Sequence, residues 1–235
     1  LSDSTREELD TFLKLWLSNF INDQLHDLLN LTKVDFNNQY LRALLFQVYE
    51  NNGVMKRSEA ETIIKLIPKE ERKKIWKMGI KLGRYHIFLP KMLKPKAVKL
   101  RINLWKIYNE KHSSAQIPQF GLNFIVDSKN DKKFLLLCGF ENFKNFFVRV
   151  DILEKLFINI LEKTKDRKFT VSAEMMNLLG CSKENFYKLM ILMNYKKDKD
   201  KDTYIFGGDK KKSKKIIKSK TFSSPFEKLA SLNIK

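Results

Sequence analysis

Residues 79–105 read GIKLGRYHIFLPKMLKPKAVKLRINLW, and this stretch decides how the first half of the chain is interpreted. Basic residues at helical spacing lead into it, and the apolar run YHIFLP at residues 85–90 interrupts them. A second basic segment follows from Lys94. Pro95 indicates that this segment begins a helix, because proline is favoured in the first turn of a helix. The pattern predicts two basic helices separated by a short apolar break.

Working outward from this stretch, residues 1–112 are predicted to form an all-helical bundle. Capping boxes at Ser4-x-x-Glu7 and Ser58-x-x-Glu61 begin two of the helices. Apolar residues then recur at three- and four-residue spacing, which is typical of a helix with one buried face. The expected helices span 4–29, 38–52, a segment from 58, 68–84 and 95–108.

Beyond residue 112 the pattern changes from helical to mixed. Residues 113–133 are predicted to be a linker or loop, and 134–206 a small winged-helix-like α+β module. The expected order is strands at 134–138 and 146–150, a helix at 151–163, a short extended piece at 169–171, helices after Ser172 and Ser182, and a hairpin at 195–206. The predicted fold class is therefore mainly α.

The last segment separates into two parts by composition. Residues 207–222 are lysine-rich and predicted to be a basic disordered linker. Residues 223–235 regain apolar side chains, and Phe226, Leu229 and Leu232 line up on one side of a short helix. We expect this segment to dock onto the body of the protein or onto a partner, although a frayed terminus is the simpler alternative.

The chain has a net charge of +19 over 235 residues, with 46 basic residues of which most are lysine. A charge of this size attracts polyanions, and nucleic acid is the most common one. Two alternatives stay open. The lysine excess can reflect an AT-rich coding sequence, and a basic surface can also bind an anionic protein.

Nucleic-acid contact is predicted at the two basic segments, whose lysines and arginines would neutralise backbone phosphates. The alternative is an ordinary solvated face. Tyr85 and His86 are weighed as stacking residues, although the IFLP run more often buries itself in a bundle. The predicted backbone contacts are Arg72, Lys73, Lys77, Lys81, Arg84, Lys94, Lys96, Lys99 and Arg101.

The sequence carries no motif for chemistry of its own. It has no P-loop, no GxSxG, no HExxH and no CxxC, and its two cysteines, Cys138 and Cys181, form no metal-binding pattern. We therefore predict no catalytic residue, metal or cofactor in this chain, and no membrane span. The chain begins at Leu1 without an initiator methionine, so we expect a piece of a longer, cytoplasmic protein.

Four segments resemble, in the same order, a region C-terminal to the motor in alphaproteobacterial ATP-dependent helicases. These helicases are related to the DExH RNA helicases of the mitochondrial degradosome. The segments are 79–105, with LGRYHIFLP, LKP and LRINLW; 148–156, with VRVDILEKL; 175–181, with MMNLLGC and Phe186 following; and 224–229, with SPFEKL.

The resemblance implies a superfamily-two helicase whose ATP-binding and DExH residues precede Leu1. ATP and Mg²⁺ would bind that motor and not this chain. The implied role is an accessory region that contacts RNA or DNA or braces the motor, with a nuclease as a possible partner of the C-terminal segment. The alternative is a stand-alone winged-helix nucleic-acid-binding or regulatory protein without a motor.

Overall fold

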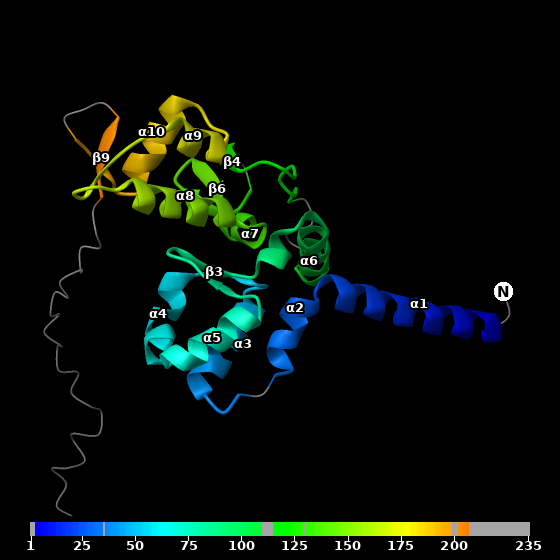
Figure 1. Cartoon of the computed structure of the whole chain (residues 1–235). Helices are drawn as coiled ribbons and strands as arrows, with labels where there is room; N and C mark the ends of the chain where they lie inside the picture. Colours follow the sequence, from blue (N-terminus) through cyan, green and yellow to red (C-terminus); the bar gives the residue numbers. More distant parts are fainter. Residues whose placement is uncertain (1–2, 35, 110–114, 129, 199–201, 207–235) are drawn as a thin grey trace, which may run out of the picture.

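The protein is described from a computed structural model covering residues 3–34, 36–109, 115–128, 130–198 and 202–206. Within these residues it is mainly α-helical, with three small antiparallel sheets of three strands each. Figure 1 shows two bodies, one built from the first half of the chain and one from the second, with a long N-terminal helix projecting from the first. The docking residues Phe226, Leu229 and Leu232 lie outside the described residues.

The first module, residues 26–93, contains a sheet, so the prediction of an all-helical bundle for residues 1–112 is wrong. Strand β3 lies in the centre of that sheet and β1 and β2 lie at its edges. All three residues of β3 are buried. The apolar run at residues 85–90, predicted as a break between two helices, therefore supplies the central strand of this sheet. The elements are α2 (His26–Leu29), η1 (Asn30–Thr32), α3 (Gln39–Glu50), β1 (Val54–Lys56), α4 (Arg57–Leu66), α5 (Lys69–Lys77), β2 (Lys81–Leu82), β3 (His86–Phe88) and η2 (Pro90–Leu93).

Gly79 ends the helix that was predicted to continue to Arg84. Its φ of 80° is a left-handed conformation that glycine adopts without strain. The Gly79 N–H donates to the Trp76 carbonyl and the Ile80 N–H to the Ile75 carbonyl, which closes the last helical turn. The chain then runs into the β2–β3 hairpin.

A middle segment, residues 95–149, connects the two modules and carries its own sheet, in which β6 lies between β4 and β5. The run 134–138, predicted to be a strand, forms the last four residues of a helix and its C-cap, Cys138. The Asp131 carboxylate accepts hydrogen bonds from the Lys133 and Phe134 N–H groups and so caps this helix. The predicted linker 113–133 supplies strand β4. The elements are α6 (Pro95–Tyr108), β4 (Phe124–Val126), α7 (Lys132–Leu137), β5 (Phe140–Phe143) and β6 (Phe146–Arg149).

The second module, residues 150–205, has the predicted order of helix, strand, two helices and hairpin. Its buried apolar side chains come from every one of these elements except the short edge strand β8. The elements are α8 (Val150–Lys163), β7 (Lys168–Thr170), α9 (Ala173–Leu179), α10 (Lys183–Leu192), β8 (Lys196–Lys197) and β9 (Thr203–Ile205).

The two modules repeat one topology. In the first, α3, β1, α4, α5, β2 and β3 follow one another, and the sheet order is β1-β3-β2. In the second, α8, β7, α9, α10, β8 and β9 follow one another, and the sheet order is β7-β9-β8. Helix α5 of the first module therefore corresponds to α10 of the second.

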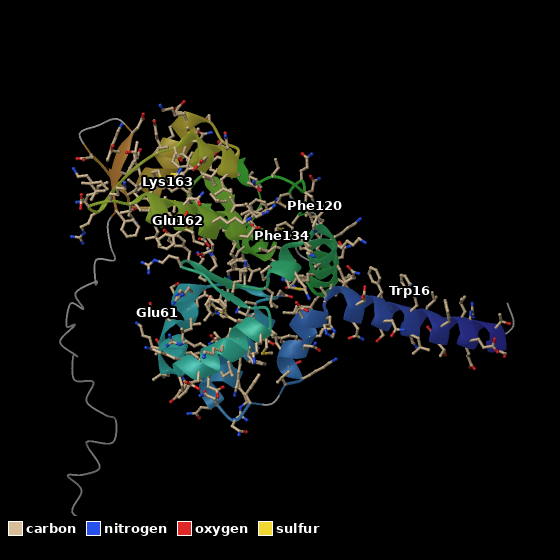
Figure 2. The ribbon with its side chains drawn as sticks, in the orientation of Figure 1. Trp16, Glu61, Phe120, Phe134, Glu162 and Lys163 are labelled. Carbon is tan, nitrogen blue, oxygen red and sulfur yellow. The ribbon has the colours of Figure 1, made fainter. Side chains whose placement is uncertain are left out.

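Helix α1 (Asp3–Gln24) contributes little to either core, because none of its side chains is buried. It runs away from the first module, and Figure 2 shows Trp16 well out along it. Only Ile21, near its end, packs against the first core. None of the described helices is both long and apolar enough to cross a lipid bilayer.

Candidate nucleic-acid interface

Helix α5 presents the strongest group of exposed cations in the first module. Lys69, Lys73 and Lys77 are exposed, and their spacing of four residues puts them along one side of the helix. The opposite side is anchored by Ile75, which is fully buried. None of the three lysines takes part in an ion pair among the described residues, whereas Lys74 pairs with Glu71 at 2.8 Å.

Lys69 is not among the predicted contacts, because the predicted stripe of Lys73, Lys77 and Lys81 runs forward along the chain. Helix α5 ends at Lys77, so Lys81 lies on strand β2 instead. The stripe therefore extends one turn back and not one turn forward. The four-residue spacing back from Lys73 was the signal that would have identified Lys69.

Two of the predicted arginine contacts bond backbone carbonyls inside the protein, and for the buried one, Arg101, the assignment to a phosphate surface is wrong. The half-buried Arg72 guanidinium donates to the carbonyls of Ile64 and Ile67, at 2.9 and 3.1 Å, and so ties α5 to the end of α4. Arg101 is 1% exposed. A buried guanidinium cannot reach a phosphate outside the molecule.

Arg101 joins three separate backbone segments. Its guanidinium donates to the carbonyl oxygens of Asn52, Met92 and Leu137, at 2.5, 2.7 and 3.3 Å. Burial lowers the pKa of Arg101 to about 10, so the side chain still carries its charge at neutral pH. The residue holds the first module to the middle segment.

The remaining predicted cations lie on the surface but not on one continuous face. Lys94, Lys96 and Lys99 are exposed at the start of α6, which Figure 1 shows beside the base of α1 and apart from α5. Arg84 is exposed in the β2–β3 turn, with its guanidinium 5.7 Å from the centre of the Phe157 ring of the second module. The predicted pair of adjacent basic helices is therefore not formed.

The β2–β3 turn is held by the carboxylate of Glu154 on α8. Its oxygens accept hydrogen bonds from the backbone N–H groups of Arg84, Tyr85 and His86, at 2.5, 2.8 and 2.9 Å. Gly83 makes room for it, since a Cβ there would lie 2.3 Å from the Glu154 carboxyl carbon. The hairpin turn of the first module is thus clamped against the second.

His86 is 1% exposed, so the proposal that it stacks on a base is wrong. Its Nε2 lies 2.7 Å from Glu141, and Lys56 donates to the other oxygen of that carboxylate at 2.8 Å. Its Nδ1 lies 3.8 Å from Glu154, which is too long for a hydrogen bond but close enough for charge attraction. Tyr85 is half-buried, with its hydroxyl 3.4 Å from that of Tyr195.

Charge attraction dominates the titration of this cluster. Burial alone would lower the pKa of His86, but the hydrogen bond with Glu141 and the nearby Glu154 carboxylate outweigh it and raise that pKa. Burial would raise the pKa values of Glu141 and Glu154, but their interactions with His86, and those with Lys56 and the hairpin backbone respectively, outweigh it and lower them. These charged side chains hold the two modules together and do not form a solvent-accessible site.

The corresponding face of the second module is less positive. On α10, Lys188 pairs with Glu184 at 2.6 Å, and Lys183 lies 3.5 Å from Asp202. The Lys183 and Lys197 ammonium groups lie 5.5 and 5.8 Å from the centre of the Tyr187 ring. Because carboxylates offset these lysines, α5 is the better candidate for contact with a polyanion.

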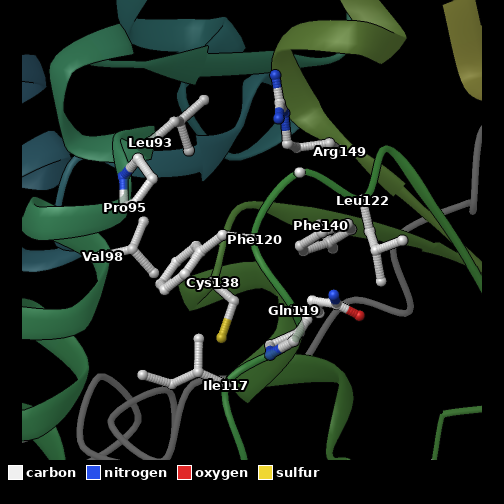
Figure 3. Close-up of a pocket in the computed structure, with 12 residues that line it drawn as sticks. Leu93, Pro95, Val98, Ile117, Gln119, Phe120, Leu122, Cys138, Phe140 and Arg149 are labelled. Carbon is white, nitrogen blue, oxygen red and sulfur yellow. The ribbon is translucent and has the colours of Figure 1, made fainter.

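One pocket lies where α6, the loop at residues 117–122 and the β5–β6 sheet meet. Figure 3 shows Pro95, Val98 and Phe120 around it, with the Cys138 sulfur among them. Burial raises the pKa of the Cys138 thiol to about 12, so it is protonated and a poor nucleophile at neutral pH. Within the described residues, no three His, Cys, Asp or Glu side chains are placed to share a metal ion.

Comparison of the chain with protein-family models, curated proteins and solved structures finds no significant match.

Proposed function

We propose that this chain binds the sugar–phosphate backbone of RNA or DNA through helix α5. The observation that carries the proposal is the row of Lys69, Lys73 and Lys77, exposed on one side of α5 and without ion pairs among the described residues. Cations placed in this way release condensed counterions when they meet phosphates, which drives binding at low salt.

The repeated topology supports the same proposal. A helix, a strand, two helices and a hairpin, with the third strand central in the sheet, is the order of a winged helix. On this interpretation the chain holds two winged helices, and α5 occupies the position of the recognition helix in the first. Fold alone does not establish function, so the lysine row and not the topology carries the argument.

We further propose that the chain is the C-terminal accessory region of a cytoplasmic superfamily-two helicase of the type its sequence resembles. Helix α1 supports a bracing role, because its large apolar side chains are exposed, with Phe12 at 63% and Trp16 at 55%. In such a protein the motor would cover this face. A stand-alone winged-helix binder or regulator is the alternative, and the paired modules are compatible with it.

The backbone-binding proposal is tested by replacing Lys69, Lys73 and Lys77 with Gln and titrating labelled single-stranded RNA by fluorescence anisotropy. With three phosphate contacts removed, the slope of log affinity against log salt should fall by about 2. Binding at low salt should weaken at least tenfold, on the order of 1.4 kcal/mol.

The matched control replaces three exposed lysines elsewhere, Lys132, Lys144 and Lys155, with Gln. It removes the same charge but leaves α5 unchanged, so it should keep most of the binding if α5 is the contact surface. Equal losses in the two triple variants would mean that net charge and not α5 drives binding. Unchanged binding in the α5 variant would refute the proposal.

A further inference from the structure

Trp76 is the most unusual residue on α5, because its side chain is 73% exposed. Two apolar residues close to it in the chain are buried instead, because Ile75 is 0% exposed and Ile80 is 1% exposed. Trp76 therefore does not belong to the core that holds α5 in place. A large aromatic ring left in water offers a flat apolar surface to a ligand.

The lysine row surrounds this ring. Lys73 and Lys69 precede Trp76 by three and seven residues and so share its side of the helix, and Lys77 follows it directly. The Arg72 guanidinium, also on this side, is turned toward the carbonyls of Ile64 and Ile67. The indole thus lies among cations that attract phosphates.

The side chains of α5 favour single-stranded over double-stranded nucleic acid. Base edges in the major groove of a duplex are read mainly by planar or bidentate side chains such as Arg, Asn and Gln, and α5 has no Asn or Gln and only the engaged Arg72. Its lysines can also reach guanine, but as point charges they hold phosphates equally well. Stacking needs an accessible base face, which unpaired nucleotides offer and an intact duplex does not. A tryptophan among lysines matches a single strand.

We infer that Trp76 is a stacking platform for an unpaired base, and that α5 selects single-stranded over double-stranded nucleic acid. This inference rests on the proposed function, because the lysines hold the backbone while the indole receives the base. It assigns the two residue types different effects: the lysines set the salt dependence of binding, and Trp76 sets the preference for single strands.

The test is Trp76→Ala in the full chain, with a labelled single-stranded RNA and a duplex of the same sequence as probes. Because stacking on an aromatic side chain contributes strongly to each bound base, we expect single-strand affinity to fall about tenfold or more. Duplex affinity and the salt slope should stay unchanged. Trp76→Phe should recover most of the single-strand affinity, because a phenyl ring also stacks.

The matched control is Trp16→Ala, since Trp16 is 55% exposed on α1 and away from the lysine row. It should leave both affinities unchanged. A direct readout is the fluorescence of Trp76 in a Trp16→Phe, Trp105→Phe background, which single-stranded RNA should quench and duplex should not.

The outcomes separate the inference from the proposed function. If Trp76→Ala leaves single-strand affinity unchanged, or weakens both probes equally, while the Lys69, Lys73 and Lys77 variant still loses binding, the stacking role is refuted and backbone binding stands. If the lysine variant also binds normally, both are refuted.

Discussion

Arg101 shows that a basic residue in a basic helix can be part of the core. Its single guanidinium bonds carbonyls from the α3–β1 turn, from η2 and from α7. A planar group with several fixed donors can satisfy acceptors in different directions, which lysine cannot do. The residue stabilises the junction where three segments meet.

We predict that Arg101→Lys lowers the free energy of unfolding by about 2 kcal/mol, because at least one buried carbonyl loses its donor. Urea denaturation measures this. Affinity for single-stranded RNA, measured on folded protein, should not change, because Arg101 does not face solvent. The exposed neighbour Lys99, changed to Gln, is the control and should leave stability unaltered. Normal stability of the Arg101 variant would contradict the structural role.

His86 makes stability depend on pH. Its pKa is raised above 6.5 in the folded protein, so its contribution is complete below that pH and is lost as the pH rises through the folded pKa. Glu141 and Glu154 have pKa values lowered from 4.5, so their contribution is complete above that pH and is lost as the pH falls through the folded values. The cluster is therefore most stabilising between these limits.

We predict that the free energy of unfolding declines as the pH rises above about 6.5 and through the raised pKa of His86, because the protonated form of His86 is favoured more in the folded than in the unfolded state. Denaturant titrations at a series of pH values measure the decline. In His86→Gln the protein should be less stable throughout, and the decline should largely vanish. An unaltered pH profile in that variant would assign the effect to other groups.

At the scale of elements, α1 is predicted to be dispensable for stability. Removing residues 1–20 should change the free energy of unfolding by less than about 0.5 kcal/mol, because the side chains of residues 3–20 are exposed and Ile21 is retained. Leu41→Ala, at a fully buried position in α3, is the comparison and should cost about 2–5 kcal/mol. Thermal and urea denaturation distinguish the two. A large loss on truncation would show that α1 packs onto the body.

The helices were predictable from sequence where spacing and caps agreed, as in α3, α6, α8 and α10. The predicted secondary structure was wrong where a single residue decides where a helix begins or ends. Gly79 ends α5 through its left-handed conformation, and Asp131 caps α7 in a short apolar run that is equally typical of a strand. Strands β1 to β3 are two or three residues long, too short for a periodicity of two to be visible.

The candidate site was predictable only in part, for a related reason. A lysine spacing identifies a helix face, and Lys73 and Lys77 were found in this way. Whether a side chain such as Arg101 or His86 lies inside depends on residues far along the chain. Glu154, for instance, meets His86 across a separation of 68 residues. Local patterns contain no information about such a partner.

At the scale of the whole molecule, Glu154 couples the two modules, and we predict that Glu154→Ala loosens them. Three backbone N–H groups of the hairpin lose their acceptor, which should cost about 3 kcal/mol or more. Hydrogen–deuterium exchange at residues 84–86 should rise sharply. Glu162→Ala, at an exposed position near the end of the same helix, should leave exchange there unchanged. Equal protection in the two variants would show that the clamp is unimportant.

The clamp also sets an order of events on the ribosome. The Glu154 carboxylate follows Arg84 by 70 residues, so it is synthesised several seconds after the hairpin at about 5–20 residues per second. During that interval the nascent first module carries uncapped N–H groups and an unpaired His86. We therefore expect its hairpin to settle only after α8 has left the exit tunnel, so that the later half of the chain completes the earlier one.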